Sequence, residues 1–542
     1  MSVISSFNYM IMKKIFKLVF IFSILVAWLS GCKKSLLELQ NQSQYSYSNY
    51  FNNSDALNQA TVATYATLLH QGLWSREYYF IFDLLGYEAK KTTNMQGDLA
   101  QLADYKFGTN QTQIGQLWGS LYRMVFRANV VIDRANAWNP TEAADQAKLK
   151  QYVAEVKFLR ALSYFNVVSL WGKAPLITSY DSVVNNNYAP RASVAELWAF
   201  VEKDLGDAIT DLPVTYDASA LGRATQGAAI ALLGKAYLYQ QKWSDAQTQF
   251  IKLTQPPYTY TLDPSYDNLF STTNQNSPEI IFQVMNQAWT DWGIGNQYYV
   301  FGGQETWGGK ATHSDRAQEY GFNDWNNVYI SQAAVKKFAY PSPADGTPYV
   351  DPRAYSTFYG DKPSGGDTVY CEQCATGKIS FPFNATDPQG DYKWRKYEYY
   401  NEVDHFNGPQ SAINAVVIRY ADILLMLAET YIQQGNSGIE PLGLINQVRA
   451  RVGALPYTTL VDQTTAMNIL SRERQLELCG EQSRYFDLIR WGTAAQTINA
   501  ERAAEPGDGS QPFQDKNVLL PIPDVEKNYN PNVAKDIQDG WN

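Results

Sequence analysis

One helical stretch constrains the fold more than any other part of the chain: residues 152–175, YVAEVKFLRALSYFNVVSLWGKAP. Its apolar residues recur at helical spacing and form a wide stripe: Phe158, Leu159, Ala161, Leu162, Phe165 and Val168. Gly172 and Pro175 end the helix, because glycine accepts the left-handed conformation and proline prevents the helix from resuming. A helix that is apolar over so much of its circumference needs neighbours on more than one side. The stretch therefore predicts a central core helix.

The composition excludes several classes of protein. The formal net charge of the 542 residues is −9, and no basic run follows the N-terminus, which argues against a nucleic-acid partner. The three histidines, His70, His313 and His405, lie far apart and lack metal-ligand spacing, so we expect neither histidine-based catalysis nor a histidine-rich metal site. Aromatic residues make up 14% of the chain, which is more than a core requires and indicates rings that face a ligand or partner.

The N-terminus has the features of a lipoprotein signal. Lys13, Lys14 and Lys17 precede an apolar run over residues 18–29, which is too short to span a bilayer. The run closes with Leu-Ser-Gly-Cys, which resembles the bacterial lipobox, in which the cysteine is lipidated and becomes the first residue after cleavage. We therefore expect a lipid anchor on Cys32. An ordinary cleaved signal or a chance cysteine is the alternative.

The remaining cysteines and the acidic loops are the other possible metal ligands of the chain. Cys371 and Cys374 form a lone C-E-Q-C motif without a second pair or a nearby histidine, so a local disulfide is favoured over zinc outside the cytoplasm. Cys479 lies in a helical, apolar setting and is expected to be a small buried residue. Residues 361–367 are rich in oxygen ligands for calcium but lack EF-hand spacing. We predict no metal and no cofactor.

Periodicity divides the chain into consecutive segments: a signal peptide (1–31), a lipidated N-terminus and tether (32–54), an N-terminal helical part (55–255), an irregular, aromatic-rich part (256–410) and a C-terminal helical part with an extended tail (411–542). Predicted helices besides the central one cover about 55–70, 114–134, 193–211, 223–253 (a hairpin), 331–338, 415–431, 439–452 and 465–491. A short strand is predicted at 279–284. Such paired helices resemble tetratricopeptide units. The fold class is thus mainly α, with a loop-rich subdomain containing a few short strands.

Six segments, in order, are similar to the SusD/RagB family: EVKFLRALSYFNVVSLWGKAPLI, RATQGAAIALLGKAYLYQQKW, VIRYADILLMLAETY, LINQVRARVG, RERQLELCGEQSRYFDLIRWG and VLLPIP. The resemblance implies an outer-membrane lipoprotein of Bacteroidota-type bacteria with four tetratricopeptide-like helix pairs and an irregular, ligand-facing subdomain. Such a protein sits as a lid on a SusC-like TonB-dependent transporter and captures glycans, or peptides in the RagB branch. One departure is that Lys33 and Lys34 follow the cysteine, where surface-exposed members often carry acidic residues.

Glu477 and Glu481 are the obvious candidates for the acid and base of a glycosidase. Four residues apart on one helix, however, they lie side by side and not across a substrate from each other. We expect Arg474 and Arg484 to neutralise them in a helix-packing network. We therefore predict no catalytic residues.

Sugar binding needs flat apolar faces for the C–H side of a pyranose ring and polar groups for its hydroxyls. Residues 287–329 supply ten aromatic rings in 43 residues with polar side chains among them. The favoured ligand contacts there are Trp289, Trp292, Trp307, Trp325 and Tyr329. The alternatives are a small core beneath the loops or an interface with the transporter.

A second candidate wall lies in residues 73–98, because the ligand site of the family also draws on loops of this N-terminal part. Trp74, Tyr78 and Asn94 are the candidates, although nearby rings of the same stretch belong equally well to a core. Together with the family resemblance, these residues lead us to expect a non-catalytic surface lipoprotein that captures glycans and passes them to a SusC-like transporter. Peptide capture is the nearest alternative; an outer-membrane glycoside hydrolase and a helical-repeat scaffold without ligand are more distant ones.

Overall fold

The structure is a computed structural model of the chain. It describes residues 12–18, 50–95, 97–181, 188–271, 276–286, 316–320, 326–359, 368–370, 378–380, 392–397, 413–505, 509–536, 538 and 540–541. The chain divides into two units, Met1–Asn52 and Asn53–Asn542. Residues 12–18 of the first unit are helical with exposed side chains. Within the described ranges, no helix combines the length and the apolar character needed to cross a membrane.

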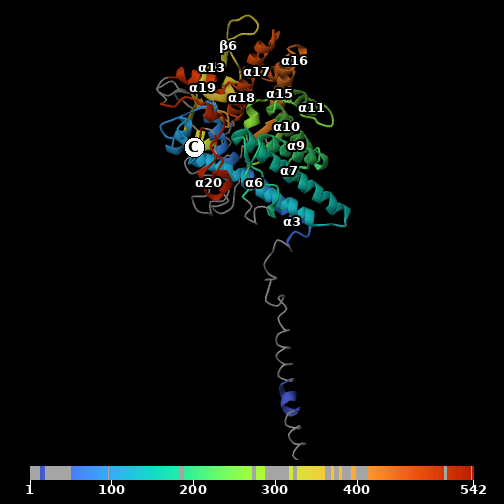
Figure 1. Ribbon diagram of the computed structural model, residues 1–542. Coiled ribbons are helices and arrows are strands. Elements are labelled where there is room, and N and C mark those ends of the chain that lie inside the picture. Colours follow the sequence, from blue (N-terminus) through green and yellow to red (C-terminus); the bar gives the residue numbers. More distant parts are fainter. Residues whose placement is uncertain are drawn as a thin grey trace, which may run out of the picture. The chain divides into compact units, whose positions relative to one another are not determined.

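The second unit is built on a row of long helices: α3 (Ser54–Tyr65), α6 (Thr112–Ala137), α7 (Ala143–Trp171), α9 (Val194–Asp211), α10 (Gln226–Tyr239), α11 (Trp243–Leu253), α15 (Tyr420–Gln433), α16 (Ile439–Arg451) and α17 (Gln463–Leu478). From α6 to α11 each helix packs against the next in chain order, and α11 then packs against α15 (Figure 1). This row of packed helix pairs confirms the predicted mainly α, tetratricopeptide-like architecture.

Helix α7 is the predicted central helix. It contacts α3, α6, α9 and α10, and the six residues of its apolar stripe are all buried. Two of its charged residues are buried in ion pairs: Arg160 Nε lies 2.7 Å from Asp204 Oδ2 of α9, and Glu155 Oε2 lies 2.9 Å from Arg223. The helix ends at Gly172, whose φ of 65° requires glycine. The local pattern thus predicted both the burial and the end of this helix.

Helices α10 and α11 approach closely at Gly234, where an added Cβ would lie 2.5 Å from Cε1 of Phe250. We expect Gly234→Ala to lower the free energy of unfolding by about 1–3 kcal/mol, because the buried ring has no room to move. Gly206→Ala is the matched control: Gly206 is an exposed helical glycine of α9 with no atom near its added Cβ, so alanine should stabilise by about 0.5–1 kcal/mol. Urea unfolding of both variants measures the difference; equal stabilities would contradict the close approach.

The other described helices are short: α4 (Glu77–Leu85), α5 (Gly97–Ala103), α12 (Arg316–Tyr320), α13 (Gln332–Lys337), α14 (Ala354–Thr357), α18 (Arg484–Arg490), α19 (Ala494–Ala503), α20 (Asp524–Tyr529) and α21 (Pro531–Ala534). Helical turns cover Ala66–Leu69, Gln71–Ser75, Ala218–Ala220, Asp267–Phe270 and Asp515–Val518.

The described strands form antiparallel pairs: β1 (Ala89–Lys91) with β5 (Val328–Ile330), β2 (Ala174–Pro175) with β3 (Arg191–Ala192), β4 (Ile280–Val284) with β12 (Ala415–Arg419), β6 (Ala339–Pro341) with β7 (Pro348–Val350), β8 (Phe358–Tyr359) with β11 (Lys393–Trp394) and β9 (Thr368–Tyr370) with β10 (Lys378–Ser380). Pairs of such short strands are marginal alone and depend on packing against helices. They confirm an irregular part with a few short strands.

Three predicted elements were wrong in detail. Residues 415–419 are strand β12 and not the start of a helix, because their β-branched side chains pair with β4. The predicted helix over 465–491 is interrupted: α17 ends at Leu478, Gly480 adopts a φ of 73°, and α18 starts at Arg484. The tail is not wholly extended, because Asn530 accepts the N–H groups of Asn532 and Val533 and caps α21.

Candidate ligand-binding site

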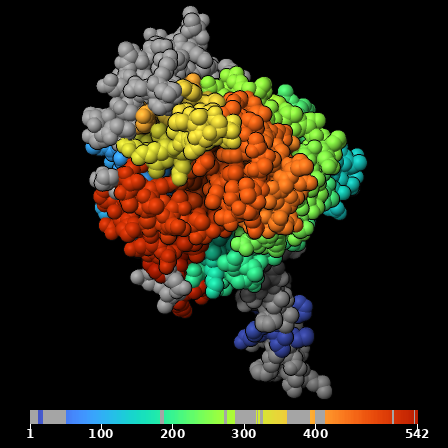
Figure 2. Space-filling view, turned by 90° about the horizontal axis from the view of Figure 1, so that it is seen from above, coloured from blue at the N-terminus to red at the C-terminus, as the bar shows by residue number. Residues whose placement is uncertain are grey.

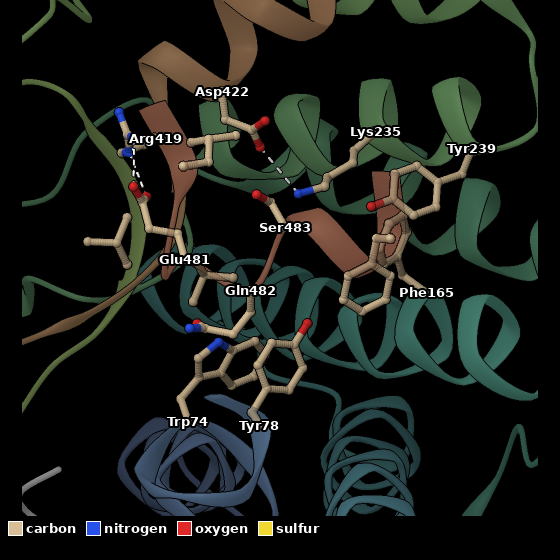
Figure 3. Close-up of a pocket in the computed structure, with 14 residues that line it drawn as sticks. Trp74, Tyr78, Phe165, Lys235, Tyr239, Arg419, Asp422, Glu481, Gln482 and Ser483 are labelled. Carbon is tan, nitrogen blue, oxygen red and sulfur yellow. Dashed lines mark hydrogen bonds and ion pairs between the residues drawn. The ribbon is translucent and has the colours of Figure 1, made fainter. Parts of the chain in front are cut away.

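Two of the predicted site residues form one aromatic wall. The turn Gln71–Ser75 and helix α4 place the rings of Trp74 and Tyr78 in a stack, with centroids 4.7 Å apart and planes inclined by 28° (Figure 3). The hydroxyl of Tyr78 donates to Asn166 Oδ1 of α7 at 3.0 Å, and burial raises the pKa of Tyr78 above its ordinary value. Trp74 is only 5% exposed. The wall is therefore an interior feature of the helical scaffold.

The wall faces a small cavity lined on its other side by polar residues (Figure 3). Lys235 Nζ lies 3.3 Å from Asp422 Oδ2, and Gln482 and Ser483 come from the turn between α17 and α18. The cavity has a volume of about 50 Å³, which holds water but is well below the ~300–1,000 Å³ typical of ligand pockets. In this arrangement Trp74 and Tyr78 support the site from within and do not offer a sugar-sized pocket.

The other two described candidates, Asn94 and Tyr329, lie at the edge formed by β1 and β5. Tyr329 pairs with Lys90 across the two strands, and its hydroxyl is 3.3 Å from Asn326 Nδ2. Thr92 Oγ1 donates to the carbonyl of Asn326 at 2.6 Å and accepts the N–H of Asn94 at 3.1 Å. Asn94 is exposed and Tyr329 half-buried. The structure therefore brings together residues from both predicted walls, although they are far apart in sequence.

The described ends of the aromatic-rich segment are attached to the scaffold beside the cavity. Asn286 donates its backbone N–H to Asn414 Oδ1 and its side-chain amide to the carbonyl of Ile413, both at 2.8 Å. On α12, Arg316 lies 3.1 Å from Asp83 Oδ2 of α4 and donates to the carbonyl of Gly480 at 2.7 Å. Asn286 and Arg316 thus fix the points between which residues 287–315 run.

A second contact ties α12 to the β1–β5 edge. Glu319 is fully buried; its carboxylate accepts Arg76 Nε at 2.5 Å, and its backbone carbonyl accepts the N–H of Asn327 at 2.8 Å. Asn327 is the residue whose carbonyl accepts the N–H of Thr92 at 3.0 Å. The same helix therefore holds the Trp74 turn, through Arg76, and the edge that carries Asn94 and Tyr329.

Several predicted residues lie outside the described residues: Trp289, Trp292, Trp307, Trp325, Cys32, Cys371, Cys374, His313, His405 and the loop 361–367. Cys479 is described; it is a fully buried free thiol, as predicted, and burial raises its pKa. Lys235, Gln482 and Ser483 line the cavity but carry no signal in the sequence, because their segments show only the periodicity of packed helices.

Glu477 and Glu481 belong to a buried ion network. Glu477 lies 2.6 Å from Arg419 and 3.0 Å from Arg353 and also pairs with Arg451, while Glu481 lies 2.7 Å from Arg419 and 2.6 Å from Lys396. Burial acts to raise the pKa of Glu477, but the three guanidinium groups outweigh it and hold that pKa well below its usual range. A carboxylate held ionised in this way lacks the proton that a general acid needs, so this pair does not have the form of a glycosidase site.

The predicted partners of these glutamates were wrong. Arg474 pairs with Asp487 at 2.7 Å and with Asp422 at 2.8 Å, and Arg484 pairs with Glu501 at 2.7 Å. The turn after Leu478 explains one of these pairs, because it allows α18 to bring Asp487 to Arg474. Asp422 belongs to α15 and Glu501 to α19, so the other two partners come from neighbouring helices.

The turn after α17 also holds a buried acid, Glu88, whose Oε2 accepts the N–H of Gly480 at 3.0 Å. Burial and the nearby Asp83 raise the pKa of Glu88 to about 8. In the unfolded chain this group ionises near its ordinary pKa of about 4.3. Between these two pKa values the unfolded chain has lost the proton that the folded chain retains, so stability falls as pH rises from about 4.3 to 8.

We therefore expect Glu88→Gln to gain stability relative to the natural chain as pH rises from 5 to 8, with no further gain above pH 8. The measurement is urea unfolding of both proteins at pH 5, 6.5, 8 and 9. The difference in free energy of unfolding between the two proteins at each pH does not contain the contributions of the other titrating groups, because both proteins share them. A difference in stability that is independent of pH would contradict the raised pKa.

Comparison with known proteins assigns the chain to a family. The profile of the SusD family matches residues 278–541, and a profile described as "starch-binding associating with outer membrane" matches residues 36–238. A SusD-like protein of Formosa agariphila is 24% identical over 507 residues, covering 89% of this chain and 91% of the relative. The starch-binding protein SusD of Bacteroides thetaiotaomicron is 23% identical over 470 residues, covering 80% of each.

Solved structures share the fold. A SusD superfamily protein from Bacteroides vulgatus superposes with a TM-score of 0.72 at 25% identity, covering 89% of this chain and 98% of that one. A laminarin-binding SusD-like protein superposes with a TM-score of 0.67 at 24% identity, covering 88% and 98%. Two family profiles matched in order, relatives aligned along most of their length and a common fold lead to one conclusion: the chain belongs to the SusD family.

Proposed function

We propose that the chain is a lipoprotein of the outer-membrane surface that captures oligosaccharides and hands them to a SusC-like TonB-dependent transporter. The observation that carries the proposal is the meeting of the two predicted walls at the β1–β5 edge, where Lys90 pairs with Tyr329. A relative and a solved neighbour are named for starch and laminarin binding, which makes sugars the class of ligand to test first.

Capture of a sugar requires only groups that bind it, namely ring faces and hydrogen-bonding side chains. Trp289, Trp292, Trp307 and Trp325 supply ring faces for the C–H side of a sugar, and the amide of Asn94 supplies a donor and an acceptor for hydroxyls. The Trp74–Tyr78 stack supports them from the helical scaffold. Because Glu477 and Glu481 are committed to buried ion pairs, the proposed role is capture without hydrolysis.

The proposed anchor is an acyl chain on Cys32, with signal cleavage just before it. Expression in a Bacteroidota host with labelled palmitate tests this part separately. Label should enter the natural chain and be absent from Cys32→Ala, which should also leave the membrane fraction. Label that persists in Cys32→Ala would contradict lipidation at this residue.

Binding of residues 33–542 to a panel of polysaccharides and peptides tests the ligand. We expect one glycan class to bind and Trp292→Ala/Trp307→Ala/Trp325→Ala to weaken that binding at least about tenfold, because each ring–sugar contact contributes free energy of the order found for aromatic pairs. Tyr188→Ala/Tyr529→Ala, which removes two exposed rings elsewhere, is the control. Binding that has the same affinity and the same number of bound sugars in the triple variant as in the natural chain would reject the site; peptide binding alone would favour the RagB-like function.

A further inference from the structure

A second hollow lies on the face formed by the C-terminal helices. We name this hollow the α17–α18 groove. It is formed by α17, α18 and the first residues of α19, with contributions from the start of α11 and the ends of α13 and α15. Figure 2 shows this face, on which the orange and red surfaces of these helices adjoin. The volume of the groove is about 750 Å³, within the ~300–1,000 Å³ of typical ligand pockets.

Three of the four arginines that line the groove are paired with acids of the fold; the fourth, Arg472, has its guanidinium 5.3 Å from the ring centre of Tyr340. Arg474 is held by Asp487 and Asp422, and Arg484 by Glu501. Arg490 pairs with Asp487 at 2.7 Å and with Glu429. These ion pairs fix most of the floor of the groove and neutralise three of its arginines; the other cations in the lining are Arg472 and Lys337, and Lys337 lies 3.2 Å from Glu501.

The walls above this floor carry two partly exposed indole rings and several uncharged polar side chains. Trp491 is held in place, because its Nε1 donates to Glu429 Oε1 at 2.7 Å and the guanidinium of Arg490 lies 4.8 Å from its ring centre. Trp243 lies at the start of α11. The uncharged polar side chains include Gln433, Asn468, Ser471, Gln475, Thr493 and Thr497.

Gln475 gives an independent indication of a ligand. Its Nε2 atom is buried, lies in the lining of the groove and has no hydrogen-bond partner in the part of the chain that the structure describes. Buried donors are normally paired, and the Gln475 side chain as a whole is half-buried, so it gains a partner if it turns its amide toward an acceptor bound in the groove. An uncharged, hydroxyl-rich ligand with an apolar ring face matches both the donor and the indoles.

We propose that the α17–α18 groove is a second glycan-binding site, separate from the Trp74 wall; this rests on the proposed function, because it assumes the same class of ligand. The two hollows share Ser483 but lie on different sides of Asp422, which Lys235 contacts from the cavity and Arg474 from the groove. The groove thus adds a binding position that does not depend on the predicted aromatic segment.

Calorimetric titration of residues 33–542 with maltohexaose and with laminarihexaose tests the inference. We expect two bound sugars per chain for one of these probes, and one after Asn468→Trp, which fills the groove from an exposed position of α17. Thr464→Trp, at an exposed position of the same helix outside the groove lining, is the matched control and should still bind two. Trp243→Ala/Trp491→Ala should weaken groove binding about tenfold without the added bulk.

The Trp292→Ala/Trp307→Ala/Trp325→Ala variant separates the two proposals. If it retains one sugar per chain and Asn468→Trp then removes that sugar, the groove binds on its own. If the triple variant binds as the natural chain does while the groove variants bind none, the groove stands and the site in the aromatic segment fails. Unchanged binding in both groove variants, or groove-dependent binding of peptides but not sugars, would overturn the inference, as would failure of the natural chain to bind either probe.

Discussion

Arg353→Met is expected to lower the free energy of unfolding by about 3–5 kcal/mol, the usual effect of removing one partner of a buried ion cluster. Arg353 has no exposed surface and binds Asp351 at 2.8 and 2.9 Å, Glu473 at 2.7 Å and Glu477 at 3.0 Å. After substitution the two glutamates keep other arginines. Asp351 keeps only hydrogen bonds, among them one from Tyr340 at 2.8 Å, so a buried carboxylate loses its counter-ion.

Lys203→Met provides the matched control, because Lys203 forms an exposed pair with Asp207 at 2.6 Å and should change stability by less than about 1 kcal/mol. Arg353→Met/Asp351→Asn should recover part of the loss by removing the unpaired charge. Urea unfolding at pH 7 measures all three variants. A loss for Arg353→Met no larger than that for Lys203→Met would show that the cluster does not hold the irregular part to α17.

Gly480→Ala is the second large expected effect. Gly480 has a φ of 73°, and an added Cβ would lie 2.7 Å from Cζ3 of the fully buried Trp394. The left-handed conformation costs about 1–2 kcal/mol for alanine, and overpacking adds about 1–3 kcal/mol. The carbonyl of Gly480 also accepts Arg316 of α12, so we expect weaker glycan binding as well as lower stability.

Gly492→Ala separates the cost of the left-handed conformation from the cost of overpacking. Gly492 has a φ of 69°, but nothing lies within 4 Å of an added Cβ, so only the conformational cost of about 1–2 kcal/mol applies. Thermal and urea unfolding of the two variants measure the difference. If they lose equal stability, the packing of Trp394 on the turn is not as described.

The sequence correctly predicted those helices whose formation depends on residues close to one another in the chain. The apolar stripe of α7 and the capping box of α9 are examples: Ser193 accepts the N–H of Glu196 at 3.2 Å, and Glu196 accepts the N–H of Ser193 at 2.8 Å. Strand β12 was missed because its pairing partner, β4, is remote in sequence. The break after Leu478 was missed for a similar reason, since the residues that fix Gly480 are Trp394, Arg316 and Glu88.

The candidate site, too, was predicted only in part. The density of aromatic residues selected Tyr329, and the family resemblance selected the stretch with Trp74, Tyr78 and Asn94. The structure places Asn94 and Tyr329 at one edge. The sequence does not show that Trp74 is buried, because burial depends on the turn between α17 and α18 that closes the cavity. The α17–α18 groove was not predicted at all, since its residues come from six helices or their ends and form no motif in the sequence.

Titration of residues 33–542 with a panel of oligosaccharides, followed by analysis of the recovered sugar, tests glycan capture most directly. We expect saturable binding to at least one oligosaccharide, which is recovered intact and without new reducing ends. Release of reducing ends would contradict capture without hydrolysis. Binding of peptides with no glycan bound would contradict the proposed class of ligand.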